Sequence, residues 1–163
     1  TRGYNTHAKM NPPLRTWQDV QAIKEGLRDG TIDVIATDHA PHATQEKQQE
    51  FTEAPFGIVG LETALSLTLA LVEEGVLTIE SAVEKLATAP AKAFSLNAGT
   101  LAVGAPADVA IVDQHMQWEV DPSRFRSKSR NTPFAGWKVK GRVTTTIVAG
   151  RVVFELEQPG RQA

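Results

Sequence analysis

The sequence predicts an α/β fold, in which helices cover parallel strands, followed by an antiparallel β segment. An amphipathic helix is followed, after a very short connection, by the apolar and β-branched residues 32–37, an order typical of α/β barrels and doubly wound sheets. A second helical stretch, residues 60–75, is apolar on nearly all sides and is expected to be largely buried. Near the end, residues 144–149 and 151–155 flank Gly150 and predict an antiparallel hairpin.

Composition limits the classes of protein to consider. The chain has 163 residues, 41% of them hydrophobic and 22% charged, with a net charge of −2. This length supports a sizeable core, and the near-neutral charge argues against nucleic acid or a membrane surface as a partner. The lack of cysteine excludes disulfides and thiol nucleophiles and fits a cytoplasmic protein. The longest apolar run, residues 64–72, is too short to span a bilayer.

The ends of the first helix can be predicted along with its apolar face. Thr16 and Asp19 have the spacing of an N-cap and a capping-box acid, and Gly30 is well placed to end the helix. Pro12 and Pro13 stiffen the segment before it, because each fixes its own φ angle.

The rest of the chain divides at Gly99. Before it, Thr78 is expected to cap a helix that runs to residue 87, and Pro90 is expected to begin a short one. After it, the sequence predicts a strand–turn unit at 99–104, strands at 108–113 and 117–120, and a long connection at 123–142.

The stretch 32–42 carries the residues best suited to chemistry. Its apolar run ends in Asp38, His39 and His42, and Pro41 forces the chain to turn there. Chemistry in α/β folds is placed at the carboxyl ends of strands. A single Asp after a strand is also a common turn former. Three groups that can bind metal or move protons within five residues nevertheless indicate a polar site.

Two other segments allow both a functional and a structural interpretation. Asn11, held rigid by the prolines, either grips a ligand or simply leads into the helix. Residues 43–57 form a long loop that ends in Pro55-Phe56-Gly57. Its glycine allows the backbone to approach a ligand closely, but an ordinary turn with an apolar anchor explains the same residues.

Several of these segments together resemble one family. Residues 9–15 (Lys-Met-Asn-Pro-Pro-Leu-Arg), 36–42 (Ala-Thr-Asp-His-Ala-Pro-His) and 55–57 occur in this order in bacterial class I dihydroorotases, which belong to the amidohydrolase superfamily. Residues 99–108 and 131–136 also look like this family. The Asp-His-Ala-Pro segment alone is similar to hydantoinases and allantoinases, whereas Asn-Pro-Pro-Leu-Arg favours dihydroorotase.

The resemblance implies a fold and a reaction. Residues 1–98 would form the C-terminal part of a metal-dependent (β/α)8 TIM barrel, and residues 99–163 the strands of a small composite β-sandwich. The reaction would be the reversible, zinc-dependent cyclisation of N-carbamoyl-L-aspartate to L-dihydroorotate in pyrimidine biosynthesis. The complete enzyme would hold one or two zinc ions.

The resemblance also implies residue roles. Asp38 matches a metal-ligating aspartate that carries a proton from the metal-bound water to the leaving amide nitrogen. Asn11 and His42 match residues that hold the substrate carboxylate. Phe56 and Gly57 match a pair whose backbone contacts the substrate ring.

His39 matches a family position that is not a metal ligand, and we expect it to contact and orient the ligand residues.

Other features of the family are expected outside this segment. The remaining ligands and a substrate-binding arginine belong to an N-terminal part of the barrel, so residues 1–163 alone are expected to be an inactive C-terminal fragment. The complete enzyme would be a homodimer or a complex with aspartate transcarbamoylase. The alternatives are a hydantoinase or allantoinase, or a non-catalytic dihydroorotase-like subunit of aspartate transcarbamoylase.

Overall fold

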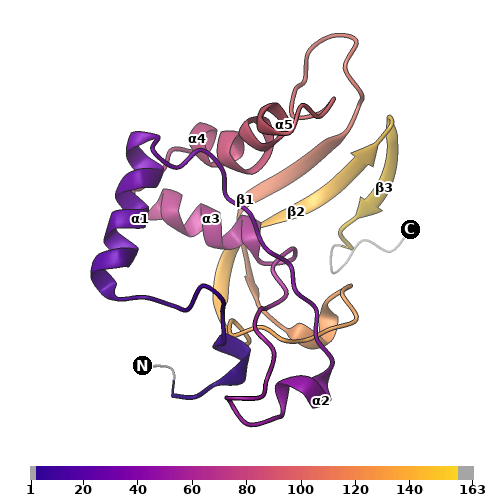
Figure 1. Ribbon diagram of the computed structural model, residues 1–163. Coiled ribbons are helices and arrows are strands. Elements are labelled where there is room, and N and C mark those ends of the chain that lie inside the picture. The colour runs from indigo at the N-terminus through magenta and orange to yellow at the C-terminus, as the bar shows by residue number, and fades with distance from the viewer. Residues whose placement is uncertain (1–2, 158–163) are drawn as a thin grey trace.

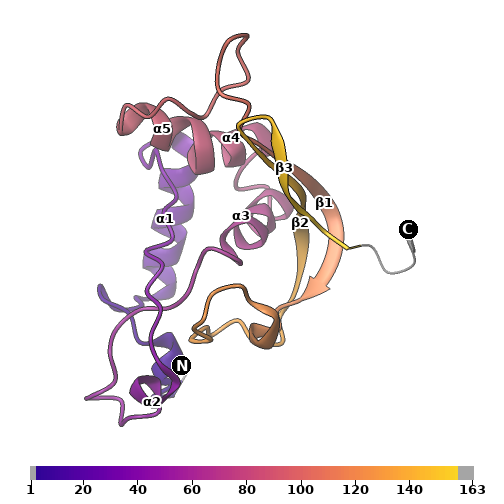
Figure 2. The ribbon, with the colours of Figure 1, turned by 90° about the vertical axis from the view of Figure 1, so that its right-hand side faces the viewer.

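Helices and one antiparallel sheet make up the computed structural model, which describes residues 3–157 (Figure 1). Helix α3 lies between α1 and the sheet (Figure 2). Residues 1–2 of the predicted barrel part and residues 158–163 of the predicted β-sandwich part lie outside the described residues. In chain order the elements are η1 (Thr6–Ala8), α1 (Trp17–Asp29), α2 (Thr44–Lys47), α3 (Ala64–Glu73), α4 (Ile79–Val83), η2 (Glu84–Thr88), α5 (Ala89–Ala93), β1 (Val109–Glu119), η3 (Pro122–Arg124), β2 (Lys138–Val148) and β3 (Arg151–Glu155).

Helix α1 begins and ends as predicted. The Thr16 side chain accepts a hydrogen bond from the Asp19 N–H, and the Asp19 carboxylate accepts one from the Thr16 N–H at 2.8 Å. Gly30 closes the helix in the left-handed conformation, with φ of 87°. Leu27 is the one fully buried residue of the helix and packs with Val76 and Leu77.

Helix α3 packs directly on the sheet, as its apolar composition predicts. It begins at Ala64, later than the predicted residue 60, because the chain turns at 61–63. Ser66 is buried and donates to the Gly141 carbonyl of β2 at 2.6 Å. Gly141 has φ of 86°, and a Cβ atom there would lie 2.1 Å from Leu69 Cδ1, so another residue would be strained and would displace the Leu69 side chain.

The sheet has the order β1-β2-β3, with both pairs antiparallel, and it confirms the predicted C-terminal hairpin. The predicted strands 108–113 and 117–120 are one strand, β1, with an irregularity between Asp113 and Gln117. The Asp113 carboxylate accepts the N–H groups of His115 and Met116, which interrupts the ladder there. A second core cluster consists of Val59, Val120 and Phe125, and Trp118 of β1, Val139 of β2 and Phe134 pack against it.

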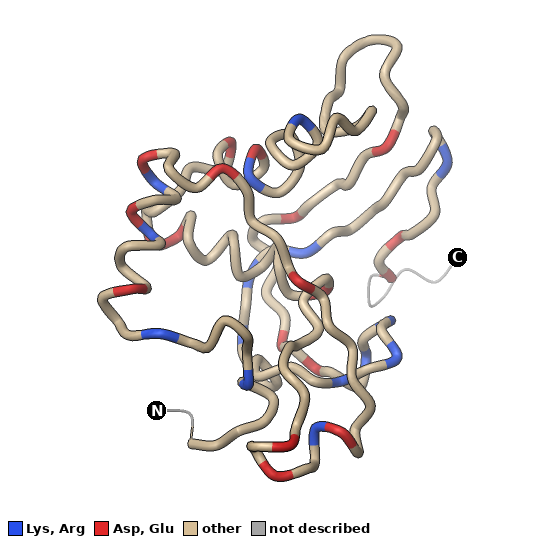
Figure 3. The backbone as a smooth tube through the Cα atoms, in the orientation of Figure 1, with Lys and Arg blue, Asp and Glu red and all other residues tan. Residues whose placement is uncertain are grey.

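Two predictions about the C-terminal half are wrong. Residues 138–142 lie in strand β2 and not in a connection, because their alternating lysine and arginine residues conceal a half-buried strand. Residues 99–104 contain a turn but no strand. Charges of both signs are spread along the chain, and the connection between β1 and β2 carries several basic residues (Figure 3).

Residues 32–37 were predicted as a buried strand, but they form none. Within this segment the Ile35 N–H donates to the Lys85 carbonyl at 3.0 Å, and no strand of the described residues runs beside it. The parallel pairing occurs further along, as a single bridge between His39 and Ile58. A parallel strand needs neighbours to accept its hydrogen bonds, and the one sheet within residues 3–157 is antiparallel.

The predicted helix 79–87 consists of two helical segments. Thr78 caps α4 and accepts a hydrogen bond from the Ser81 N–H, as predicted. The helix then widens into a π-helical turn, η2, before α5. None of the helices in residues 3–157 has the length and apolar character needed to cross a membrane.

Candidate active site

A cavity of about 210 Å³ brings together four of the predicted site residues from three separate segments. Asp38 comes from the end of the segment 32–38, Asn11 from the proline-rich segment, and Phe56 and Gly57 from the long loop. Met10, Thr37, Ala40 and Ile58 complete its walls. A larger and more open hollow of about 470 Å³ lies against α4 and η2 and contains none of the predicted site residues.

Asp38 combines an unusual backbone conformation with a side chain that has no partner in the described part of the chain. Its backbone is left-handed, with φ of 43°, a conformation that is uncommon for residues other than glycine and is concentrated at functional sites. Its side chain is exposed and has no hydrogen-bond or ion-pair partner among residues 3–157. The carboxylate can therefore accept a ligand without first breaking a contact with the protein.

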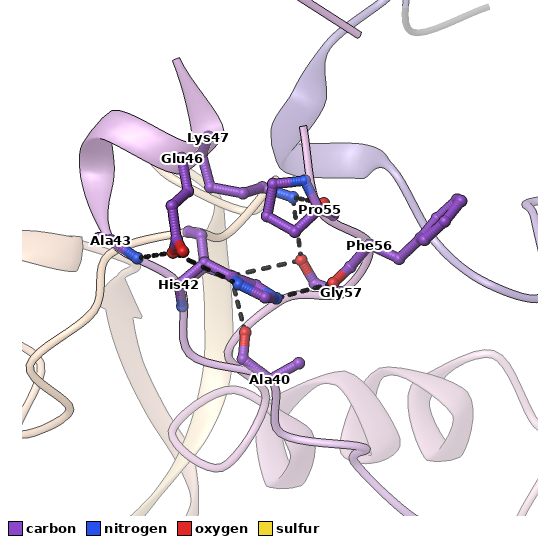
Figure 4. Close-up of polar contacts among 9 residues, drawn as sticks. Ala40, His42, Ala43, Glu46, Lys47, Pro55, Phe56 and Gly57 are labelled. Carbon is purple, nitrogen blue, oxygen red and sulfur yellow. Dashed lines mark hydrogen bonds and ion pairs between the residues drawn. The ribbon is translucent and has the colours of Figure 1, made fainter. Parts of the chain in front are cut away.

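The two histidines after Asp38 are held by backbone groups. His39 Nδ1 accepts the N–H groups of Gly60 at 3.1 Å and Leu61 at 3.4 Å, so it braces the turn that leads into α3. His42 Nε2 lies 2.8 Å from the Phe56 carbonyl, and because a carbonyl can only accept, this nitrogen carries the proton (Figure 4). His42 Nδ1 lies 3.6 Å from Glu46 Oε2.

This geometry affects the role expected of His42. The ring does not line the cavity in the structure, and its Nε2–H is directed to the backbone of Phe56. His42 thus holds one wall of the cavity in place. Its direct contact with a substrate carboxylate stays a prediction.

The loop that carries Phe56 and Gly57 meets the segment around Ala40 at very short distance. Gly57 has φ of 104°, and a Cβ atom there would lie 2.5 Å from the Ala40 Cβ. Its N–H donates to the Lys9 carbonyl at 2.8 Å. Glycine is therefore required at this wall both for its backbone conformation and for the close approach.

Asn131, which the sequence does not single out as a site residue, joins these segments from the connection between β1 and β2. It is buried, and its Nδ2 donates to the carbonyls of Ala40 at 2.8 Å and Gly57 at 3.3 Å. Its Oδ1 accepts the His42 N–H at 3.2 Å, and its backbone carbonyl accepts the Val59 N–H. The Asn131 side chain thus connects the Ala40 segment to the Gly57 loop, and both segments line the cavity.

A carboxylate without a partner in residues 3–157, such as that of Asp38, can bind a metal ion through its oxygens. A catalytic zinc site generally has about three protein ligands. Within the described residues no three His, Asp or Glu side chains are grouped so that they could hold a metal ion. Backbone groups already occupy His39 Nδ1 and His42 Nε2. Residues 3–157 therefore form no complete metal site by themselves, and the ligand role of Asp38 stays a prediction.

The family of the chain follows from its sequence. The amidohydrolase family matches it over residues 12–153, which include Asp38 and the loop residues of the cavity. The chain belongs to the amidohydrolase family. This result confirms the family predicted from the short motifs, and the helices with their small sheet are one part of the amidohydrolase fold.

Relatives within this family extend the comparison. The chain is 60% identical over 155 residues to a dihydroorotase of Syntrophotalea carbinolica and 58% identical over 154 residues to one of Geobacter metallireducens. These alignments cover 95% and 94% of the chain. The chain spans 36% of the length of each of these relatives.

Solved hydantoinase structures share the fold. An L-hydantoinase from Arthrobacter aurescens superposes with a TM-score of 0.88 at 36% identity, covering 94% of this chain and 36% of its own. A D-hydantoinase from Thermus sp. superposes with a TM-score of 0.84 at 29% identity, covering 92% of this chain and 34% of its own.

Proposed function

We propose that this chain is part of a dihydroorotase, which interconverts N-carbamoyl-L-aspartate and L-dihydroorotate in pyrimidine synthesis. The 58–60% identity to dihydroorotases over nearly the whole chain carries the proposal. It favours dihydroorotase over hydantoinase, since the hydantoinase structures named above are 29–36% identical. The cavity supports it, because Asn11, Asp38, Phe56 and Gly57 surround one space.

Asp38 is the residue that we assign to proton transfer. In the hydrolytic direction its carboxylate accepts a proton from the attacking water as the new C–O bond forms. It then delivers that proton to the ring nitrogen as the C–N bond breaks, and ring closure reverses these steps. Zinc, when bound, polarises the carbonyl and lowers the pKa of water. Asp38 supplies one of the zinc ligands, and the rest of the polypeptide supplies the others. We place the complete enzyme in the cytoplasm.

In this proposal Asn11 and His42 bind the substrate carboxylate. His42 either contacts it directly, after its ring leaves the Phe56 carbonyl, or acts indirectly by holding the cavity wall in place. We expect Asn11→Ala and His42→Ala, made in the full-length protein, to raise KM for dihydroorotate by about tenfold or more, as when one charge-assisted hydrogen bond is lost. Kinetics together with metal analysis of the purified variants measures this.

The metal content separates binding from ligation in these variants. Bound zinc should be unchanged in both, and His115→Ala, on the exposed face of β1, should match the unmodified enzyme. Loss of zinc from His42→Ala would contradict the assignment, because it would make His42 a metal ligand.

The polypeptide 1–163 by itself should neither hydrolyse dihydroorotate nor retain stoichiometric zinc, because Asp38 is its single candidate ligand in the described chain. It should also self-associate, since Trp17 and Ile23 on α1 are 68% and 55% exposed. Zinc analysis, an activity assay and light scattering test this. A monomer with one tightly bound zinc and measurable turnover would contradict it.

A further inference from the structure

Two lysines are buried beside the cavity without an acidic partner. Lys9 is 8% exposed and Lys47 is 2% exposed. No carboxylate in the described chain lies within ion-pair distance of either ammonium group. Buried lysines are rare, and an unpaired buried charge is costly. Both therefore require an explanation beyond packing.

The ammonium groups bind the backbone of the loop that forms one wall of the cavity. Lys9 Nζ donates to the carbonyls of Thr52 at 3.1 Å and Ala54 at 2.6 Å. Lys47 Nζ donates to the carbonyls of Pro55 at 2.8 Å and Gly57 at 3.2 Å (Figure 4). The carbonyl groups of this loop therefore point toward the two ammonium groups that donate to them.

The positive charges lie directly behind the cavity wall. Lys9 Nζ is 4.6 Å from the centroid of the Phe56 ring, and Phe56 and Gly57 line the cavity. Burial, and next the charge of Lys9, lower the pKa of Lys47. Burial, and next the charge of Lys47, lower the pKa of His7. Each ammonium group therefore lies close to the cavity wall with backbone carbonyls and no carboxylate as its hydrogen-bond partners.

We propose that Lys9 and Lys47 are positioning residues that fix the 52–57 loop and make the cavity selective for a ring that carries a carboxylate over the same ring without one. Neutral donors would hold the same carbonyls without the cost of burying charge. The two charges, which contact Phe56 and Gly57 of the cavity wall, additionally attract an anion in a cavity where Asp38 is the one carboxylate of the lining. The identity of the anionic ring rests on the proposed function.

The test uses the full-length, metal-loaded protein and removes charge while keeping a donor. Lys47→Gln and Lys9→Gln each retain an N–H donor, and Lys47→Arg retains the charge. Lys92→Gln is the matched control, because Lys92 is an exposed lysine of α5. We measure kcat and KM for dihydroorotate, and Kd by calorimetry for orotate and for uracil, which differ by one carboxylate.

Each glutamine variant should raise KM for dihydroorotate and Kd for orotate by about tenfold, equivalent to about 1.4 kcal/mol. The change in kcat and in uracil affinity should be less than about threefold, as expected if the lost term is the attraction between charges. Lys47→Arg should recover most of the lost affinity, and Lys92→Gln should match the unmodified enzyme. Lys9→Gln provides the test if Lys47→Gln does not fold.

Two results would overturn the inference. One is equal weakening of orotate and uracil, which would leave only a structural role. The other is orotate binding that does not change in either glutamine variant. Failure of the unmodified enzyme to turn over dihydroorotate would instead reject the proposed function, while the comparison of orotate with uracil would still test the selectivity.

Discussion

Asp38→Asn in the full-length protein should lower kcat for dihydroorotate by about 10²–10⁴-fold, the usual contribution of general acid–base catalysis. Asparagine keeps the size of the side chain but cannot carry the proton, and it is a weaker metal ligand than a carboxylate. The left-handed backbone at φ of 43° accepts asparagine, so the fold should persist. Steady-state kinetics, with zinc analysis and thermal melting of the same preparation, measures the effect.

Asp33→Asn is the matched control, because Asp33 is an exposed aspartate five residues earlier in the same segment. It should retain the kcat and zinc content of the unmodified enzyme. An Asp38→Asn enzyme with near-normal kcat would refute the assignment of Asp38 as proton carrier. Equal losses in both variants would point to a general effect of charge and not to catalysis by Asp38.

Gly57→Ala should lower kcat/KM by about 10–100-fold, because displacing a positioned group by about 1 Å can cost 10²-fold. The new methyl group would lie 2.5 Å from the Ala40 Cβ, and alanine at φ of 104° is strained. The loop must therefore move away from Ala40, which displaces the Phe56–Gly57 backbone. Kinetics and thermal melting test this together.

Gly104→Ala separates backbone strain from the loss of close contact. Gly104 has φ of 89°, and a Cβ atom there would meet nothing within 4 Å. This variant should lose about 1–2 kcal/mol of stability from the left-handed backbone, with kcat/KM unchanged. If Gly57→Ala keeps full kcat/KM, the loop backbone does not contribute to the site.

The local parts of the fold could be predicted from the sequence. The capping box of Thr16 and Asp19 and the turn at Gly150 are formed by residues a few positions apart, and the structure contains both. The strand predicted at 32–37 depends instead on neighbouring strands, which the described residues do not provide. Strand β2 escaped prediction at residues 138–142 because lysine and arginine stems can cover a sheet as apolar side chains do.

The site shows the same division. The motifs predicted Asn11, Asp38, Phe56 and Gly57, and these residues line one cavity, although their chemical roles stay predictions. The roles of Lys9, Lys47 and Asn131 could not be predicted. Lys47 lies in a polar stretch that looks like exposed surface, and Asn131 acts on residues 74 to 91 positions away. Nothing in the local sequence indicates that such side chains are buried.

The bonds made by Asn131 also have a consequence for synthesis on the ribosome. Asn131 is added 91 residues after Ala40, whose carbonyl it binds. At translation rates of about 5–20 residues per second, that interval is roughly 5–20 seconds. Throughout it, the nascent chain contains the segments around Ala40 and Gly57 but not the side chain that fastens them. Until residue 131 has left the exit tunnel, these segments are joined by their direct contacts alone, such as the Ala40 N–H with the Ile58 carbonyl at 2.9 Å, and the four hydrogen bonds of Asn131 are added last.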